Sequence, residues 1–173
     1  MFFGRGYKTR QGDSWSEMQR LGPDFEDIRI MRVTASNAGT LAIDEATRES
    51  DSVLRYALRT DNGWHAPQPF PASINTGEWN AHPFIAPDES YLIWDGQRGS
   101  DTNSADLYIS FKQADGQWGE AIKMGPEINT EVSEFAAQIT PDGRFLFFNR
   151  SVGEGNVDTF WVDAAIIENY RPQ

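Results

Sequence analysis

The stretch that decides the fold reads Ile139-Thr140-Pro141-Asp142-Gly143-Arg144-Phe145-Leu146-Phe147, and it has a second copy upstream, Ile85-Ala86-Pro87-Asp88-Glu89-Ser90-Tyr91-Leu92-Ile93. The copies lie 54 residues apart, and the same offset relates Trp64 to Trp118 and Asn75 to Asn129. A period of about 40–55 residues built from short strands and turns is typical of β-propeller blades. The sequence therefore predicts an all-β protein made of repeated blades.

The clearest repeat predicts four strands, at residues 81–86, 91–94, 106–111 and 118–124, each bounded by turn residues. Residues 91–94 form a continuous apolar run, as expected for a strand that is buried on both faces. The turn between the first two strands contains Asp88, whose side chain can bond to its own backbone. Four antiparallel strands per repeat is the arrangement of a propeller blade.

We predict one domain over residues 1–173, with blades at about 1–25 (partial), 26–76, 77–130 and 131–173. This division gives three to four blades per chain. Trp15 and the segment Leu21-Gly22-Pro23 match Trp118 and the segment Met124-Gly125-Pro126, so the first piece corresponds to the end of a blade. Only residues 163–170 favour a short helix.

Composition narrows the class of protein. The 173 residues carry a formal charge of −11, which argues against binding to nucleic-acid phosphates. There is no Cys, so disulfides and thiolate metal sites are excluded. No apolar run approaches the roughly 20 residues that span a bilayer, and the N-terminus shows no signal peptide. We expect a soluble protein without membrane insertion, cytoplasmic as written and periplasmic if Met1 is not the native start.

The pattern from Glu134 through residues 139–148 to Asp158-Thr159-Phe160 resembles the WD-like repeat of TolB-type β-propellers. Asp106-Leu107-Tyr108, followed by residues 116–119 and 128–130, resembles the same repeat. This family is mostly bacterial, and its repeat occurs in non-enzymatic binding propellers and in accessory domains of some peptidases. The chain departs from the pattern at Ala137, where Pro is usual, at Asn80, where Glu is usual, and over residues 26–58.

The candidate ligand-binding residues are polar side chains that open or follow the predicted innermost strands, where a propeller has the mouth of its channel. They are Glu26, Asp27, Asn80, His82, Arg98, Glu134, Gln138 and Arg150. A mouth lined by charges of one sign can concentrate a ligand of opposite charge. Ordinary solvated loops in an acidic protein are the alternative interpretation.

A calcium site is the one metal site that we consider. Asp95, Asp101 and Asp106 lie in a loop rich in Gly, Ser and Asn, and carboxylate oxygens are calcium ligands. Their spacing matches no known calcium loop, so we expect no cofactor apart from this weak candidate.

No sequence motif indicates catalysis, because the chain has neither Gly-x-Ser-x-Gly nor His-Glu-x-x-His. We therefore predict a non-catalytic binding or scaffold propeller that recognises a peptide, a protein or a small polar ligand at an acidic mouth. The alternative is a carbohydrate-active propeller, hydrolase or lectin, that uses channel carboxylates and an exposed Trp79 or Trp94. Trp15, Trp64 and Trp118 either pack between blades or form aromatic platforms, and their recurrence favours packing.

The number of strands raises a question of assembly, since three or so blades leave open strand edges. The N-terminal strand that contains Trp15 could complete the last blade of its own chain. Alternatively, two chains could close one six- to eight-bladed ring, with each N-terminal strand completing the last blade of the partner. We favour the second arrangement, a homodimer, because four full blades need roughly 200 residues.

Overall fold

The structure is a computed structural model that describes residues 1–48, 51–98 and 101–172. It confirms that the protein is all-β. The N-terminal segment contains β1 (Phe2–Phe3), β2 (Gly6–Tyr7), β3 (Arg10–Gln11), β4 (Ser14–Trp15), β5 (Gln19–Arg20) and the 3₁₀ helix η1 (Pro23–Phe25). In this segment β1, β2 and β5 form a three-stranded sheet, and β3 pairs with β4.

Two four-stranded antiparallel units follow. Unit 1 consists of β6 (Val33–Ala35), β7 (Leu41–Arg48), β8 (Asp51–Ala57) and β11 (Gln68–Pro69). A small hairpin of β9 (Arg59–Thr60) and β10 (Gly63–Trp64) precedes β11. Unit 2 consists of β12 (Trp79–Ile85), β13 (Tyr91–Arg98), β14 (Asp101–Phe111) and β15 (Ile122–Lys123). One parallel pairing, of Trp79 with Ser52, joins the two units into a mixed eight-stranded sheet.

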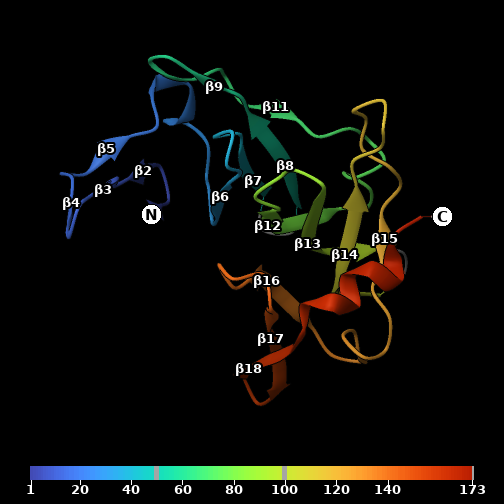
Figure 1. Cartoon of the computed structure of the whole chain (residues 1–173). Helices are drawn as coiled ribbons and strands as arrows, with labels where there is room; N and C mark the ends of the chain where they lie inside the picture. The colour runs from blue at the N-terminus through green and yellow to red at the C-terminus, as the bar shows by residue number, and fades with distance from the viewer. Residues whose placement is uncertain (49–50, 99–100, 173) are drawn as a thin grey trace.

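Unit 3 has three antiparallel strands, β16 (Glu134–Ile139), β17 (Phe145–Gly153) and β18 (Asn156–Asp163). The helix predicted at residues 163–170 is present as the 3₁₀ helix η2 (Ala164–Tyr170), which Asp163 caps by accepting the Ala165 N–H at 2.9 Å. Within the described residues the sheets do not close into a barrel. Figure 1 shows the units arranged as an arc, with the first strands β6, β12 and β16 toward its centre.

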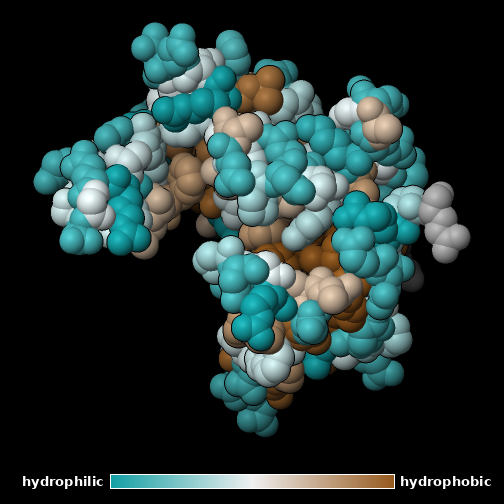
Figure 2. Space-filling view, in the orientation of Figure 1, coloured by the Kyte–Doolittle hydropathy of each residue, from teal (hydrophilic) through white to brown (hydrophobic). Residues whose placement is uncertain are grey.

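Apolar clusters lie between successive units. Leu21 and Phe25 of the N-terminal segment pack on Leu41 and Ile43 of unit 1. The second cluster joins units 1 and 2 through Leu54, Phe70, Ile74, Leu92 and Trp94. The third joins units 2 and 3 through Ile93, Leu107, Ile109, Leu146 and Phe148. In Figure 2 the outside is largely hydrophilic, and hydrophobic surface appears mainly where unit 3 faces the strands above it.

The repeated Ile-Asn-Thr segments continue the pairing where the fourth strands β11 and β15 end. The side-chain amide of Asn129 accepts the Leu107 N–H at 2.7 Å and donates to the carbonyls of Leu107 and Met124. Asn75 bonds in the same way to Leu54 and Phe70. An Asn side chain thus replaces a strand partner for the third strand of units 1 and 2.

The position beside β18 is open. β18 pairs only with β17 among the described residues, and Trp161 on this strand is 59% exposed. Within the described residues the N-terminal strand of the same chain does not complete this unit, because β4, which contains Trp15, is paired with β3.

Candidate functional site

The eight predicted mouth residues do not form one site. Glu26 lies near the N-terminal sheet, where its carboxylate forms an exposed ion pair with Arg20 at 2.6 Å. Asp27 lines a separate shallow pocket beside Arg5. Of the eight residues, only His82 and Gln138 come together in one hollow.

Glu134 and Arg150 have a structural role. Glu134 is fully buried, and its carboxylate accepts the Arg150 Nε–H at 2.7 Å and the Thr130 hydroxyl at 2.6 Å. Asn80 is also buried and bonds to Trp94 and to the Thr76 carbonyl. Arg98 donates to the Ile74 carbonyl at 3.1 Å. These four side chains are engaged within the protein, so we leave them out of the candidate binding surface.

His82 belongs to what we call the His82 cluster, formed by Arg32, Asp44, His82 and Asp95. Asp44 and Asp95 are buried on β7 and β13, at matching positions of units 1 and 2. Asp44 accepts the backbone N–H groups of Arg32 at 2.9 Å and His82 at 2.8 Å. Asp95 accepts the Ala136 N–H at 3.0 Å and lies 2.9 Å from His82 Nδ1. The carboxylates therefore join the three units.

Both donors, His82 and Ala136, have left-handed backbones, with φ of 47° and 56°. Non-glycine residues adopt this region only when their surroundings hold them there. The register shifts near these residues in β12 and β16. The shift turns one backbone N–H of each first strand toward the carboxylate of the preceding unit.

The charged groups around His82 favour protonation of its imidazole more than water does. Burial acts to lower the pKa of His82, but the hydrogen bond to Asp95 and the charges of Asp95 and Asp44 outweigh it and raise the pKa. Burial lowers the pKa of Arg32, against the attraction of the same carboxylates. Arg32 also donates to Gln138 at 3.2 Å above a hollow of about 330 Å³. The lining of the hollow includes Arg32 and His82, whereas the carboxylates of Asp44 and Asp95 are buried.

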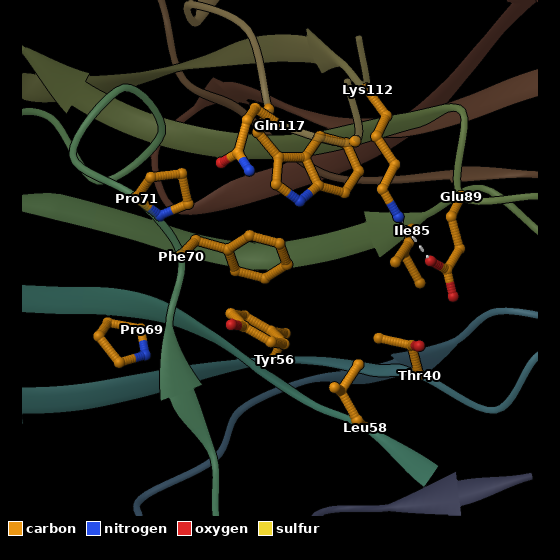
Figure 3. Close-up of a pocket in the computed structure, with 12 residues that line it drawn as sticks. Thr40, Tyr56, Leu58, Pro69, Phe70, Pro71, Ile85, Glu89, Lys112 and Gln117 are labelled. Atoms are coloured by element: carbon orange, nitrogen blue, oxygen red, sulfur yellow. Dashed lines mark hydrogen bonds and ion pairs between the residues drawn. The ribbon is translucent and has the colours of Figure 1, made fainter. Parts of the chain in front are cut away.

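A second site lies between units 1 and 2 and was not expected from the sequence (Figure 3). We call it the aromatic groove; Tyr56, Phe70 and Trp118 form its centre, and Leu58, Pro69 and Pro71 extend its walls. Its volume is about 350 Å³, within the range of small-ligand sites. The Tyr56 and Phe70 rings lie 5.3 Å apart, and the Phe70 and Trp118 rings meet edge to face at 5.7 Å.

One end of the aromatic groove is charged. Lys112 Nζ lies 2.9 Å from Glu89 Oε2, as the dashed line in Figure 3 shows. Burial acts to raise the pKa of Glu89, but hydrogen bonds from Lys112, Thr40 and Ser36 outweigh it and lower the pKa. The groove therefore offers three aromatic rings and two prolines beside one fixed ion pair.

The repeated Trp residues fit both interpretations made from the sequence. Trp64 packs edge to face on Tyr7 at 5.2 Å and donates its Nε1–H to the Gly39 carbonyl at 2.8 Å. Trp118 packs on Phe70 and at the same time lines the groove. The other groove residues come from segments far apart in the chain, so only the recurring Trp could have signalled the site.

No metal site is evident in the part of the chain that the structure describes, where no cluster of three or more His, Asp or Glu has suitable geometry. Of the calcium candidates, Asp95 is bonded to backbone and His82, and Asp106 pairs with Lys123 at 2.6 Å. The side chain of Asp101 lies outside the described residues.

No helix among the described residues combines the length and the hydrophobicity needed to cross a bilayer. Comparison with protein-family models gave no matching family, and comparison with curated proteins gave no matching relative.

Proposed function

We propose that this protein is a non-catalytic binding module built from propeller-type blades, and that the aromatic groove takes an extended peptide segment. The observation that carries the proposal is the series of three rings, Tyr56, Phe70 and Trp118, in one groove between units. Units 1 and 2 support the propeller interpretation, because each has four antiparallel strands and packs on its neighbour through one apolar face.

The chemistry of the groove favours a prolyl or aromatic side chain in the ligand. Aromatic-lined grooves bind proline-rich segments, because such segments are already extended and lose little entropy. Leu58, which is 49% exposed, adds apolar area at the rim. Lys112 and Glu89 can bond to the carbonyl and N–H groups of an extended backbone.

A carbohydrate-active function has weaker support. Glu134 and Trp94, which this function would use, are both fully buried. The half-buried ring of Trp118 is where a sugar could stack, so the same groove would be the sugar site. A glycan array therefore belongs in the test of the proposal.

The proposed partner for assembly is a second copy of the chain. The open side of β18 and the exposed Trp161 support a shared ring. Because β4, which contains Trp15, is paired with β3, a donated N-terminal strand would have to leave β3 first. This exchange makes the assembly a strand swap.

The groove is tested by selecting linear peptides from a display library against the full chain, in parallel with a glycan array. We expect prolyl- or aromatic-containing peptides, and we expect Leu58→Glu to weaken their binding by at least about tenfold. The matched control is Val132→Glu, at a position that is 39% exposed outside the groove. Binding of sugars but of no peptide, or an equal loss of peptide affinity in Leu58→Glu and Val132→Glu, would refute the peptide proposal.

A further inference from the structure

The hollow beside the His82 cluster, which we call the His82 hollow, has a volume of about 330 Å³. Segments of all three units enclose it: the residues just before β6, the first strand β12 of unit 2, and the strands β16, β17 and β18 of unit 3. Among the described residues that line it there is no Asp and no Glu, although the chain carries a formal charge of −11. The hollow therefore presents cationic and neutral polar groups to a ligand.

The guanidinium of Arg32 forms no ion pair among the described residues. It is half-buried, and its one side-chain hydrogen bond goes to the neutral amide oxygen of Gln138 at 3.2 Å. A guanidinium carries several N–H donors, so the others are left without a protein acceptor. None of the Arg32 nitrogen atoms is both closed to solvent and unbonded, so a ligand can reach these donors.

The imidazole of His82 has one ring nitrogen engaged and one available. Its Nδ1 lies 2.9 Å from Asp95 Oδ1, which holds a proton on that nitrogen. The other nitrogen, Nε2, has no hydrogen-bond partner among the described residues and is not closed to solvent. The side chain is 25% exposed and lines the hollow. In the protonated ring Nε2 is also a donor, so the ring then offers one N–H to a ligand.

One buried carboxylate fixes the backbones of both residues. Asp44 Oδ1 accepts the backbone N–H of Arg32 at 2.9 Å, and Asp44 Oδ2 accepts that of His82 at 2.8 Å. From unit 3, Asn149 adds a side-chain amide whose oxygen accepts the Thr159 hydroxyl at 3.0 Å, which leaves the amide N–H groups available. Donors anchored in this way lose little freedom when a ligand binds.

The charges around the hollow determine the charge of the ligand. Arg32 and a protonated His82 balance Asp44 and Asp95, whereas a neutral imidazole leaves one negative charge in excess. The carboxylates are buried and bonded to backbone N–H groups, and only the two cationic residues line the hollow. A single negative charge there can bond to both cations, and hydrogen bonds between charged groups are the strong ones. A dianion would add a second negative charge near the two carboxylates.

We propose that the His82 hollow binds a monocarboxylate with a small apolar body, whose oxygens accept N–H groups of Arg32 and of protonated His82. Met31 and Phe147 supply the apolar part of the lining. The carboxylate belongs to a free carboxylic acid or to the C-terminus of a peptide, since both present the same group. The site shares no lining residue with the aromatic groove and does not depend on the peptide proposal.

NMR titration of the full chain tests the class of ligand. The probes are isovalerate and the tetrapeptide Gly-Ser-Gly-Val, each compared with its amide. At about pH 6 we expect both acids to bind, and both amides to bind at least about tenfold more weakly. The tetrapeptide has no aromatic or prolyl residue, so the aromatic groove is not expected to take it. Tighter binding of the peptide acid would identify a chain terminus as the ligand, and tighter binding of isovalerate a free acid. Equal affinities for acids and amides, or no binding of either acid, would overturn the proposal.

A matched pair of variants tests the role of the guanidinium. Arg32→Gln removes it but keeps the backbone N–H that Asp44 accepts, so the fold should be retained. We expect this variant to bind isovalerate at least about tenfold more weakly than wild type. Arg29→Gln removes the same charge from an exposed position outside the hollow and should leave the affinity unchanged. An equal loss of affinity in the two variants would refute the site.

The pH dependence of binding tests the role of the imidazole. Asp95, Asp44 and Arg32 are the charged groups that act on His82, and the lining residues of unit 3 are uncharged. We expect the affinity of wild type for isovalerate to fall about tenfold between about pH 6 and about pH 9, as His82 loses its proton. His82→Asn should bind weakly at both pH values, and Asn tolerates the left-handed backbone at this position. A fall of the same size in His82→Asn would contradict the proposal.

Discussion

The carboxylate of Asp95 reaches from unit 2 to unit 3 and accepts the backbone N–H of Ala136 at 3.0 Å. Asp44 does the same one unit earlier, with the N–H of His82 at 2.8 Å, and it also accepts the N–H groups of Met31 and Arg32. The two residues thus act as fixed links between successive units.

We expect Asp44→Ala to lower the free energy of unfolding by about 3 kcal/mol or more, because three N–H groups lose a charged acceptor. Urea unfolding of the variant measures this loss. Asp88→Ala is the control, since Asp88 is exposed and bonds only within its turn, to Ser90. Equal losses in the two variants would mean that Asp44 is not a link between units.

Asn129→Ala should destabilise the protein by about 2–4 kcal/mol, because the backbone of Leu107 and the carbonyl of Met124 lose their partners. Asn129→Asp keeps the acceptor for the Leu107 N–H, but it turns a buried carboxylate oxygen toward the two carbonyl oxygens, so a loss at least as large as in Asn129→Ala is expected. Thermal unfolding of both variants tests this order. A smaller loss in Asn129→Asp than in Asn129→Ala would contradict it.

Stability should depend on pH through His82. Its pKa is raised in the folded state, so its stabilising effect is complete below the unfolded value of about 6.5 and disappears as pH rises through the folded value. Asp95, Asp44 and Arg32 are the charged groups that set this shift. We expect melting temperature to fall over that interval in wild type and to fall less in His82→Asn, while His65→Asn behaves as wild type. If the melting temperature of His82→Asn falls with pH as much as that of wild type, His82 is not the cause of the pH dependence.

Gly143 has φ of +73°, as the turn Pro141-Asp142-Gly143 predicts from its sequence. A β-branched side chain is strained in that region, so we expect Gly143→Val to cost about 1–3 kcal/mol of stability. No other atoms lie near the added Cβ, so the cost comes from the backbone alone. Gly143→Asn should cost less, because Asn tolerates a left-handed backbone. Chemical unfolding of the pair separates the two effects.

Light scattering tests the shared ring. A dimer has twice the chain mass of 19.5 kDa, and we expect it at micromolar concentration. Trp161→Asp should reduce the dimer fraction, because it places a charge on the open strand β18. The matched variant Val132→Asp places the same charge on an exposed apolar residue outside β18 and the N-terminal strands, so it should have less effect on the dimer fraction. A stable monomer in wild type rules the ring out.

The sequence predicts the strands well because each strand is a local apolar pattern between turn residues. The apolar run at residues 91–94 lies in β13, which extends to Arg98 because its polar end still pairs with β14. The fourth strand predicted at residues 118–124 is reduced to Ile122–Lys123 and an isolated bridge between Trp118 and Lys112, and between them the Ala121 N–H donates to the Ser73 carbonyl at 3.2 Å.

The sites are harder to predict because they depend on contacts between distant segments. The sequence places Glu134 and His82 at the start of first strands, but His82 lies in the middle of β12; Glu134 is buried against Arg150, and His82 lines a hollow. A pattern of residue types at a strand end does not state which side chain turns inward. The aromatic groove cannot be predicted from the sequence either, since Tyr56 and Trp118 come to line one groove only after units 1 and 2 pack together.

The hydrogen bonds that Asp44 and Asp95 make between units all run in the same order along the chain. Each buried carboxylate belongs to the earlier unit, and its backbone donor belongs to the later one. If unit 3 detaches, Asp95 loses the Ala136 donor and unit 2 is weakened in turn. Asn149 occupies the matching position in unit 3, where an uncharged amide needs no such donor. Unfolding of unit 3 should therefore destabilise unit 2 and, through it, unit 1. Neighbouring units should unfold cooperatively, although each has its own strands.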